Sequence, residues 1–305
     1  MAVLVTGGAG FIGSHLVEEL VRRGENVIVV DNFSSGKAEN IVDVKDKIEL
    51  VNCDIREKEI EDVFKAHDID VVAHLAAQIE VEKSLEDPKL DADVNLMGSI
   101  NLFELCRRYD VNKIVFTSSI AVYGEPRYLP VDEKHELAPI SPYGCAKLAV
   151  EKYLHYYWRV HGIDYIALRL ANVYGPRQKH GVIPAFITNL LRGERVVIYG
   201  DGKQTRDFVF VDDVINAILL ALEKETRHKC MNIATCKETS IIELLGLISE
   251  KMGVKAEPEF LPERKEIRRC YFSYNIARVE LKWEPKVELA EGIEKTIEWF
   301  KKTGR

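Results

Sequence analysis

The chain has 305 residues, of which 47% are hydrophobic and 30% charged, so it is long enough for a substantial buried core and is not intrinsically disordered. Its 42 Lys and Arg against 49 Asp and Glu give a net charge of -7, which argues against a nucleic-acid partner. Apolar runs such as residues 71–77 fall far short of the about 20 residues that a membrane span needs, and the first residues lack a secretory pattern, so we expect a cytoplasmic protein with no membrane partner.

The first half of the chain alternates β-branched runs with stretches of helical periodicity. The runs predict strands at residues 3–6, 26–30, 48–51, 71–74, 113–117 and 165–169. The stretches between them predict helices at residues 11–23, 57–66, 91–108 and 143–161. Strands separated by helices predict an α/β fold with a doubly wound, mostly parallel sheet that helices cover on both faces.

The regularity weakens after about residue 170, where Gly and Pro clusters separate shorter elements. We therefore expect two domains: residues 1–170 form the main sheet, and residues 171–305 form a smaller C-terminal α/β lobe that binds substrate. Three later segments are expected to return to the main sheet: residues 208–211, the helix after Asp212, and residues 231–234. Residues 207–235 are therefore assigned to the first domain.

A glycine-rich turn joins the first predicted strand to the first predicted helix. It contains Gly8-x-Gly10-x-x-Gly13, extended by Gly7, and such glycines let the backbone approach a pyrophosphate at a helix N-terminus. Asp31 ends the second predicted strand, 18 residues after Gly13, where a carboxylate accepts the ribose hydroxyls. The pattern predicts a Rossmann-type dinucleotide site. A carboxylate repels a 2′-phosphate, so NAD is favoured over NADP, and Lys37 is the nearby residue that could reverse this preference.

The sequence contains three Tyr-x-x-x-Lys patterns, of which Tyr143/Lys147 has the best context. It begins a predicted helix after Ser141-Pro142, so the phenol and the ammonium share one helix face. An adjacent cation is expected to lower the tyrosine pKa, as a general base requires. Residues 117–119 end the preceding strand, and we expect one of their hydroxyls to bind the substrate oxygen from which the tyrosine takes a proton.

Neither disulfides nor a metal site are predicted. The 6 cysteines include no Cys-x-x-Cys pair, and the 8 histidines show no His-Glu-x-x-His spacing. Most of the cysteines lie in apolar segments, where a thiol behaves as a small hydrophobic group.

Several motifs together resemble those of the extended short-chain dehydrogenase/reductases, and within them the UDP-glucose 4-epimerase-like nucleotide-sugar enzymes. The motifs lie at residues 6–15 (TGGAGFIGSH), 31–32 (DN), 53–54 (CD), 74–78 (HLAAQ), 95 (N), 116–119 (FTSS), 122–124 (VYG), 143 and 147 (Y, K), 169–176 (RLANVYGP), 205–209 (TRDFV) and 212–213 (DD). They span nearly the whole chain, and jointly they are highly specific.

The resemblance implies roles for individual residues. The catalytic residues would be Ser119, Tyr143 and Lys147. The residues that would bind NAD are Gly7, Gly10, Phe11, Ile12, Gly13, Asp31, Asn32, Asp54, Ile55, Leu75, Ala76, Ala77, Gln78, Asn95, Thr117, Tyr143 and Lys147. The residues that would bind the UDP-sugar are Ser119, Tyr143, Asn172, Val182, Ile198, Tyr199, Arg206, Arg264 and Cys270.

The resemblance also indicates the reaction. Related 4,6-dehydratases carry an Asp-Glu pair just before Val-Tyr-Gly, and this chain has Ile120-Ala121 there. Without that acid and base, elimination of water lacks a proton donor, whereas epimerisation needs only oxidation and re-reduction at one carbon. We therefore expect an NAD-dependent 4-epimerase that acts on UDP-glucose and UDP-galactose through a transient 4-keto sugar.

Three further expectations accompany this interpretation. Cys270 falls where some relatives have a bulky tyrosine, so UDP-N-acetylhexosamines are expected as additional substrates. The alternatives are a UDP-uronate or UDP-pentose 4-epimerase and, outside enzymes, an NAD-bound sensor or scaffold. Relatives commonly form homodimers through the helices that correspond to residues 91–108 and 143–161, so a homodimer is expected here.

Overall fold

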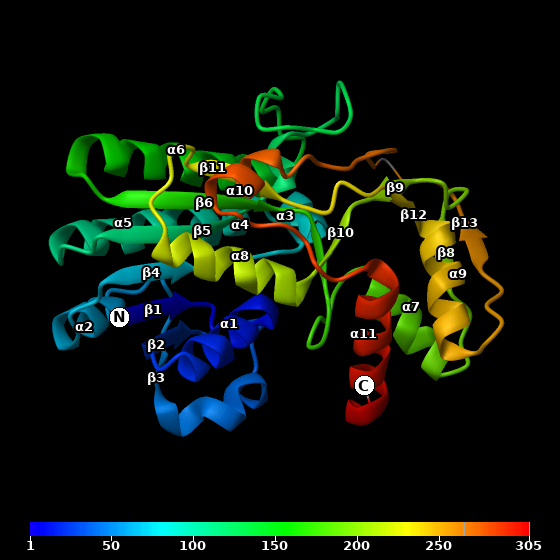
Figure 1. The fold of residues 1–305 in the computed structure, drawn as a ribbon, viewed down its shortest axis with the longest axis horizontal. Helices are drawn as coiled ribbons and strands as arrows, with labels where there is room; N and C mark the ends of the chain where they lie inside the picture. Colours follow the sequence, from blue (N-terminus) through cyan, green and yellow to red (C-terminus); the bar gives the residue numbers. More distant parts are fainter. Residues whose placement is uncertain (265, 305) are drawn as a thin grey trace.

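A parallel sheet of seven strands organises the computed structural model, which describes residues 1–264 and 266–304 (Figure 1). The strand order is β11–β6–β5–β4–β1–β2–β3, and every neighbouring pair is parallel. The strands are β1 (Ala2–Thr6), β2 (Asn26–Asp31), β3 (Ile48–Asn52), β4 (Val71–His74), β5 (Lys113–Ser119), β6 (Asp164–Leu170) and β11 (Cys230–Ile233). The predicted doubly wound fold is confirmed. Because the order reverses direction between β1 and β4, the carboxyl ends of these two strands border the crevice in which such folds bind ligands.

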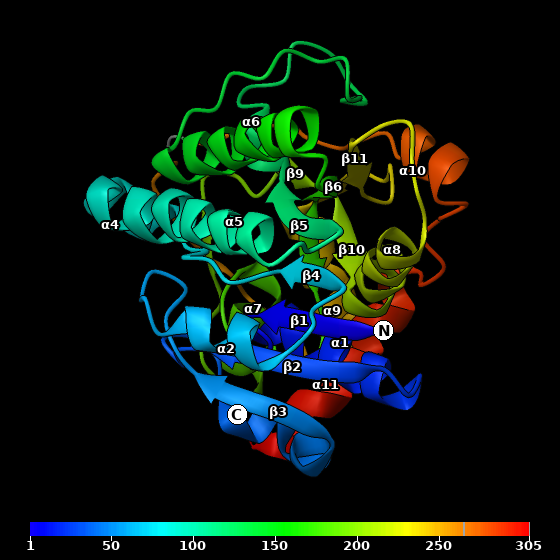
Figure 2. The same ribbon diagram turned by 90° about the vertical axis from the view of Figure 1, so that its left-hand side faces the viewer.

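Helices cover both faces of this sheet (Figure 2). Alternate residues along a strand point to opposite sides, so Val3 and Val5 pack into one buried cluster and Leu4 into the other. The first cluster is completed by α1 (Phe11–Arg22), the 3-10 helix η1 (Ala38–Lys47) and α8 (Val211–Glu223). The second is completed by α2 (Ile60–Ala66), α5 (Gly98–Arg108) and α6 (Pro142–His161). Burial on both faces explains why the inner strands β1, β2 and β4 are almost continuously apolar.

The segment predicted as one helix at residues 91–108 is built from several pieces. It comprises α4 (Pro88–Ala92), the π-helical turn η2 (Asp93–Met97) and α5, and α3 (Val81–Glu86) precedes them. Asp87 caps α4 by accepting a hydrogen bond of 3.0 Å from the Leu90 backbone N–H, and Pro88 occupies the first turn. A π-turn inserts one residue and shifts the helix face, a change that apolar periodicity does not reveal. The predicted helix at 57–66 begins later, at Ile60.

The remaining elements form three small two-stranded sheets and four helices within the described part of the chain. The sheets pair β7 (Asn172–Tyr174) with β10 (Phe208–Phe210), β9 (Thr205–Arg206) with β12 (Thr239–Ser240), and β8 (Val197–Tyr199) with β13 (Glu259–Leu261). The helices are α7 (Val182–Leu191), α9 (Ile241–Met252), α10 (Asn275–Glu280) and α11 (Leu289–Thr303). Residues 231–234 contribute to the main sheet through β11, as expected. The expectation that residues 208–211 do so is wrong, because Phe208–Phe210 pair with β7 and Val211 begins α8.

None of the helices in residues 1–264 and 266–304 combines the length and the apolar character that crossing a bilayer requires.

His74, at the end of β4, makes the fold sensitive to acid. Its side chain is fully buried, with Nδ1 2.8 Å from Thr6 Oγ1 and Nε2 2.8 Å from Ser99 Oγ. Burial lowers the pKa of His74 from 6.5 to about 3, because the charged imidazole would lose its hydration. Between these values the unfolded chain binds a proton that the folded chain does not, so the stability contributed by neutral His74 is lost as pH falls below about 6.5.

Between pH 7 and pH 4, the wild type should lose about 3 kcal/mol of stability because of His74. We expect His74→Asn to lack this part of the loss. Urea unfolding of both proteins at the two pH values measures this difference. The contributions of carboxylates are the same in both proteins and cancel in the comparison. His155→Asn replaces an exposed histidine and should behave like the wild type. An equal loss of stability in His74→Asn and the wild type would show that the buried imidazole is not responsible.

Candidate active site

The glycine-rich turn between β1 and α1 leaves no space for a side chain at Gly7 or at Gly13. Gly7 has φ of +72°, and a Cβ there would lie 2.7 Å from the Ala76 backbone nitrogen. A Cβ on Gly13 would lie 2.1 Å from the Gly7 carbonyl oxygen. Gly10 is the N-cap of α1 and no side chain caps that helix, so the backbone N–H groups of its first residues, Phe11 and Ile12, can serve an anion.

Asp31 lies at the carboxyl end of β2, beside this turn, and is 7% exposed. Its Oδ2 accepts a hydrogen bond of 2.9 Å from the Ala9 N–H and its Oδ1 one of 2.8 Å from the Phe33 N–H. Each oxygen keeps a second lone pair, which suits a vicinal diol. Burial raises the pKa of Asp31, while these two bonds and the charge of Lys179 lower it. The Nζ of Lys179 donates to the Ser35 carbonyl at 2.5 Å.

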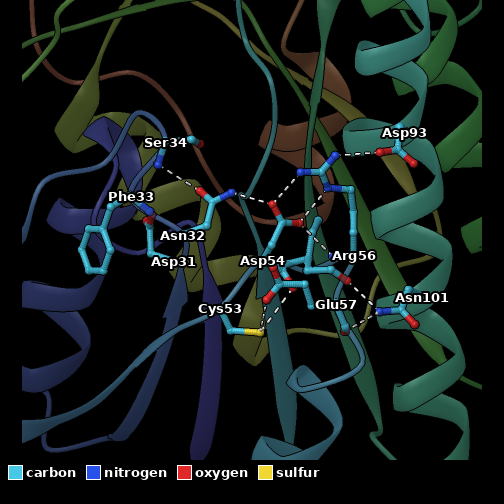
Figure 3. Close-up of polar contacts among 11 residues, drawn as sticks. Asp31, Asn32, Phe33, Ser34, Cys53, Asp54, Arg56, Glu57, Asp93 and Asn101 are labelled. Carbon is cyan, nitrogen blue, oxygen red and sulfur yellow. Dashed lines mark hydrogen bonds and ion pairs between the residues drawn. The ribbon is translucent and has the colours of Figure 1, made fainter.

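A polar network continues from Asn32 along the same edge of the sheet (Figure 3). Asn32 Nδ2 donates to Asp54 Oδ2 at 2.7 Å, and the Arg56 guanidinium donates to both Asp54 oxygens at 2.8 and 2.9 Å. These bonds, those of Arg56 first, lower the pKa of Asp54 to about 2. Arg56 also bonds Asp93 at 2.6 Å, so it joins the loop after β3 to η2. From the sequence, no role was assigned to Arg56, although a basic residue two positions after Asp54 in a turn lies close enough to pair with that carboxylate.

The loop after β4, which begins Leu75-Ala76-Ala77-Gln78, is fixed by side chains on both sides. The Ala76 N–H donates to Thr6 Oγ1 at 3.3 Å. Asn95, which is buried in η2, accepts from the Gln78 N–H and donates to the Gln78 carbonyl, both at 2.9 Å. The structure therefore brings residues 75–78 and Asn95 next to the glycine-rich turn, as a shared cofactor site requires.

The start of α6 brings the proposed catalytic side chains together. Ser141 caps the helix by accepting from the Gly144 N–H at 3.1 Å, and Pro142 is the first helical residue, as predicted. A Cβ on Gly144 would lie 2.6 Å from the Ala121 carbonyl oxygen, so only glycine lets α6 approach the 3-10 turn η3 (Ile120–Val122) so closely. Ser119 ends β5 immediately before η3, and its hydroxyl interacts with that of Tyr143.

Lys147 lies one helical turn beyond Tyr143 and is 3% exposed. Its Nζ donates to the Thr117 carbonyl at 2.9 Å and lies 4.7 Å from the Phe116 ring centroid and 5.6 Å from the Tyr143 ring centroid. Burial lowers the pKa of Lys147 to about 8, against the opposing charges of Asp91 and Glu151. The ammonium is therefore held at the site in a form that can lose its proton near physiological pH.

The expected lowering of the Tyr143 pKa is wrong for this structure. Burial raises the pKa of the Tyr143 phenol to about 12; contact with Ser119 lowers it, and the charge of Asp91 raises it further. The expectation considered only the spacing of Tyr143 and Lys147, whereas the largest influence on the phenol is its loss of hydration on burial.

The residues assigned to the UDP-sugar lie in the second part of the chain. Tyr199, next to the buried Ile198 in β8, has its ring 3.4 Å from the Arg264 guanidinium, and Arg264 also lies 4.0 Å from Glu82 in α3. Asn172 begins β7, and its Oδ1 is buried without a hydrogen-bond partner in residues 1–264 and 266–304. Val182 is the first residue of α7.

Arg206 and Cys270 lie close to each other. Arg206 donates to the Thr205 and Ile267 carbonyls at 2.8 and 2.9 Å and pairs with Glu266. Cys270 is 3% exposed, its thiol lies 3.5 Å from the Thr205 carbonyl, and burial raises its pKa to about 11.

Comparison with known proteins identifies the family. The model of the NAD dependent epimerase/dehydratase family matches residues 3–234. The chain belongs to this family. The UDP-glucose 4-epimerase of Mycolicibacterium smegmatis is 43% identical over 309 residues, which cover 99% of each chain.

Solved structures agree with this assignment. The UDP-glucose 4-epimerase of Thermotoga maritima with UDP-glucose is 44% identical with a TM-score of 0.96, and the match covers all of both chains. The UDP-N-acetylglucosamine 4-epimerase of Methanobrevibacter ruminantium, in complex with UDP-N-acetylmuramic acid, is 35% identical with a TM-score of 0.94 and covers 99% of this chain and 98% of its own. The predictions of an extended short-chain dehydrogenase/reductase, of NAD as cofactor and of a nucleotide-sugar 4-epimerase are thereby confirmed.

The residues present fit NAD. The backbone at Gly7 and Gly13 cannot accommodate a Cβ, the first turn of α1 has no side-chain cap, and the Asp31 oxygens keep free lone pairs at the end of β2. These are the features that bind a pyrophosphate and a ribose diol. The glycine-rich turn, Asp31, Asn32, Asp54 and the 75–78 loop would hold the dinucleotide.

Proposed function

We propose that this protein interconverts UDP-glucose and UDP-galactose by inverting C4 of the hexose. The observation that carries the proposal is the grouping of Ser119, Tyr143 and Lys147 at the carboxyl end of β5, in the same crevice as the glycine-rich turn. Ile120 and Ala121 form the turn η3 beside this group, so neither residue supplies the acid or base that elimination of water needs.

The chain's own residues supply the proton transfers. When bound, NAD supplies the acceptor of the hydride from C4 and the donor of the hydride that returns. Deprotonated Tyr143 accepts the proton of the C4 hydroxyl, Ser119 holds that oxygen by a hydrogen bond, and the Lys147 ammonium favours the phenolate. Tyr143 returns the proton when the alcohol forms again with inverted configuration.

The nucleotide must stay bound while the sugar rotates between the two hydride transfers. We assign this role to Asn172, Arg206 and Arg264, because guanidinium and amide groups bind phosphate oxygens by directed hydrogen bonds. The position of the Arg264 guanidinium over the Tyr199 ring supports the assignment. We also assign residues 1–170 and 207–235 to the NAD-binding domain and the rest to the nucleotide-sugar lobe.

Incubation of the purified protein with UDP-galactose tests the proposal, and UDP-glucose is the expected product. A parallel assay with UDP-glucuronate tests the alternative of a uronate 4-epimerase, in which Arg206 would bind the carboxylate of the substrate. Absence of turnover with either substrate, with NAD demonstrably bound, would support a sensor or scaffold instead.

We further propose that UDP-N-acetylhexosamines are substrates, because Cys270 leaves more space than a tyrosine. We expect Cys270→Tyr to lower kcat/KM for UDP-N-acetylgalactosamine about tenfold more than kcat/KM for UDP-galactose. Cys270→Ala keeps the residue small and should preserve the ratio, and thermal unfolding of both variants checks the packing of this buried position. If Cys270→Tyr still accepts the acetamido sugar as well as the wild type does, the gatekeeper role is wrong.

A homodimer is also proposed, with α6 and the preceding helical segment as the interface. Large hydrophobic side chains are exposed there: Met97 is 55% exposed, Tyr156 47% and Val160 60%. We expect Val160→Glu to convert a dimer into a monomer, as measured by light scattering after size exclusion. Val279→Glu, at a similarly exposed position in α10, should leave the mass unchanged. A wild type that is monomeric at micromolar concentration would refute the interface.

We propose a cytoplasmic location. All six cysteines are free thiols, a condition typical of a reducing compartment.

A further inference from the structure

Asp91 is a buried carboxylate close to the catalytic group that sequence reasoning did not identify. It lies in α4 and is 1% exposed. Its Oδ1 accepts hydrogen bonds from Gln78 Nε2 at 3.0 Å and Asn95 Nδ2 at 2.9 Å, and its Oδ2 has no partner among the residues that the structure describes. Two neutral amides compensate a buried negative charge poorly, so a positive group is needed nearby.

Lys147 is that positive group. The helix α4 packs against α6, and the Lys147 and Asp91 charges act on each other. Burial raises the pKa of Asp91, and the charge of Lys147 opposes this; burial lowers the pKa of Lys147, and the charge of Asp91 opposes this. The other carboxylate that acts on Lys147, Glu151, is already bound by both nitrogens of the Arg169 fork, at 2.9 and 2.7 Å. Asp91 is therefore the carboxylate whose charge remains available to Lys147.

The other ionisable groups around Lys147 do not replace Asp91. His74 in β4 is held neutral by burial, and Tyr143 is neutral when protonated. On the remaining elements packed against α6, Asp93 in η2 pairs with Arg56, and Glu104 in α5 bonds Tyr157 and Arg107. On α3, Glu82, Lys83 and Glu86 are exposed to solvent.

We propose that Asp91 is a positioning residue, which keeps the Lys147 ammonium charged and in place and fixes the loop at residues 75–78. The second effect follows from the Asn95 amide, which has one donor end and one acceptor end. Because Asp91 accepts from Asn95 Nδ2, Asn95 Oδ1 must face the Gln78 N–H, and the loop is held in one conformation. One carboxylate thus links the cofactor loop to the catalytic lysine.

The test is the pH dependence of kcat with UDP-galactose in the wild type and Asp91→Asn. Turnover requires deprotonated Tyr143 and protonated Lys147, so the pKa values of these two groups together set the two limbs of the profile. Asp91 raises the pKa of both groups, so its neutralisation should move both limbs to lower pH, by about one unit. A residue that matters only for packing would lower kcat at every pH and leave the limbs in place.

Glu86→Gln is the matched control, because it removes one negative charge from an exposed position five residues earlier and should leave the profile unchanged. Asp91→Ser, which is smaller and also neutral, must shift the limbs in the same direction as Asp91→Asn. An unshifted profile in both folded variants overturns the proposal.

A double-mutant cycle tests the charge pairing without catalysis. Asp91→Asn should lower the midpoint of thermal unfolding in the wild type and lower it less, or raise it, in the Lys147→Met background, where the carboxylate has lost its cation. An equal loss in both backgrounds, including failure to fold in both, would show that Asp91 serves packing alone. The inference rests on the proposed epimerisation: an inactive wild type would refute that function, whereas an active wild type with an uncoupled Asp91 would refute only this inference.

Discussion

Replacing Tyr143 by phenylalanine is expected to lower kcat for UDP-galactose by about 10²- to 10⁴-fold, the contribution typical of a positioned general base. Phenylalanine keeps the ring and its packing near Lys147, but it removes the only oxygen that this residue can offer to the substrate hydroxyl. KM should change little, because the nucleotide part of the substrate is held by other residues. Steady-state kinetics with UDP-galactose, at several pH values, measures both effects.

The chain provides a matched control for this variant. Tyr109 and Lys113 repeat the Tyr-x-x-x-Lys spacing, but Tyr109 donates a 3.0 Å hydrogen bond to Glu61, and Lys113 is bonded to the Lys224 carbonyl. Tyr109→Phe should therefore retain wild-type kcat. Full turnover by Tyr143→Phe would refute the assignment of the base, because no substitute phenol is available in this position.

Replacing Arg169 by methionine is expected to lower the free energy of unfolding by about 3–5 kcal/mol, because it leaves the Glu151 carboxylate buried without a counter-charge. Arg169 is 3% exposed, binds both Glu151 oxygens and donates to the Tyr123 hydroxyl at 2.9 Å. Ser118 also donates to Glu151, at 2.6 Å. Urea unfolding at neutral pH measures the loss.

Two further variants distinguish a buried charge from lost packing. Adding Glu151→Leu to Arg169→Met should recover most of the lost stability, since a buried pair can often be replaced by apolar side chains. Arg107→Met breaks a half-exposed pair with Glu104 and should cost less than about 1 kcal/mol. If Arg169→Met is as stable as Arg107→Met, the buried pair does not hold α6 to the sheet.

The same pair has a consequence for catalysis. Glu151 lies one turn after Lys147 in α6, and Ser118 directly precedes Ser119 in β5. The bonds among Ser118, Glu151 and Arg169 therefore fix the strand that carries the serine relative to the helix that carries the tyrosine and lysine. We expect Arg169→Met to lower kcat as well as stability.

The sequence predicted those elements of the fold that depend on residues close together in the chain. The six strands of the first half, the glycine-rich turn and the start of α6 at Ser141-Pro142 were predictable, because β-branched runs, glycine spacing and capping residues act within a few positions. Asp31 could be placed at the end of β2 for the same reason. The predicted single helix at 91–108 failed because the π-turn at Asp93–Met97 leaves no clear mark on apolar periodicity.

The amino-acid sequence by itself determined the family and the cofactor, and it predicted the serine, tyrosine and lysine that we propose as catalytic, because those residues occur in short motifs with fixed spacing. Only the tertiary structure decided which charges are buried together. The direction of the Tyr143 pKa, the Asp54–Arg56 network and the buried position of Asp91 all depend on hydration and on partners from other elements. These are set when helices pack on the sheet, so residues far apart in the chain control them and no local pattern records them.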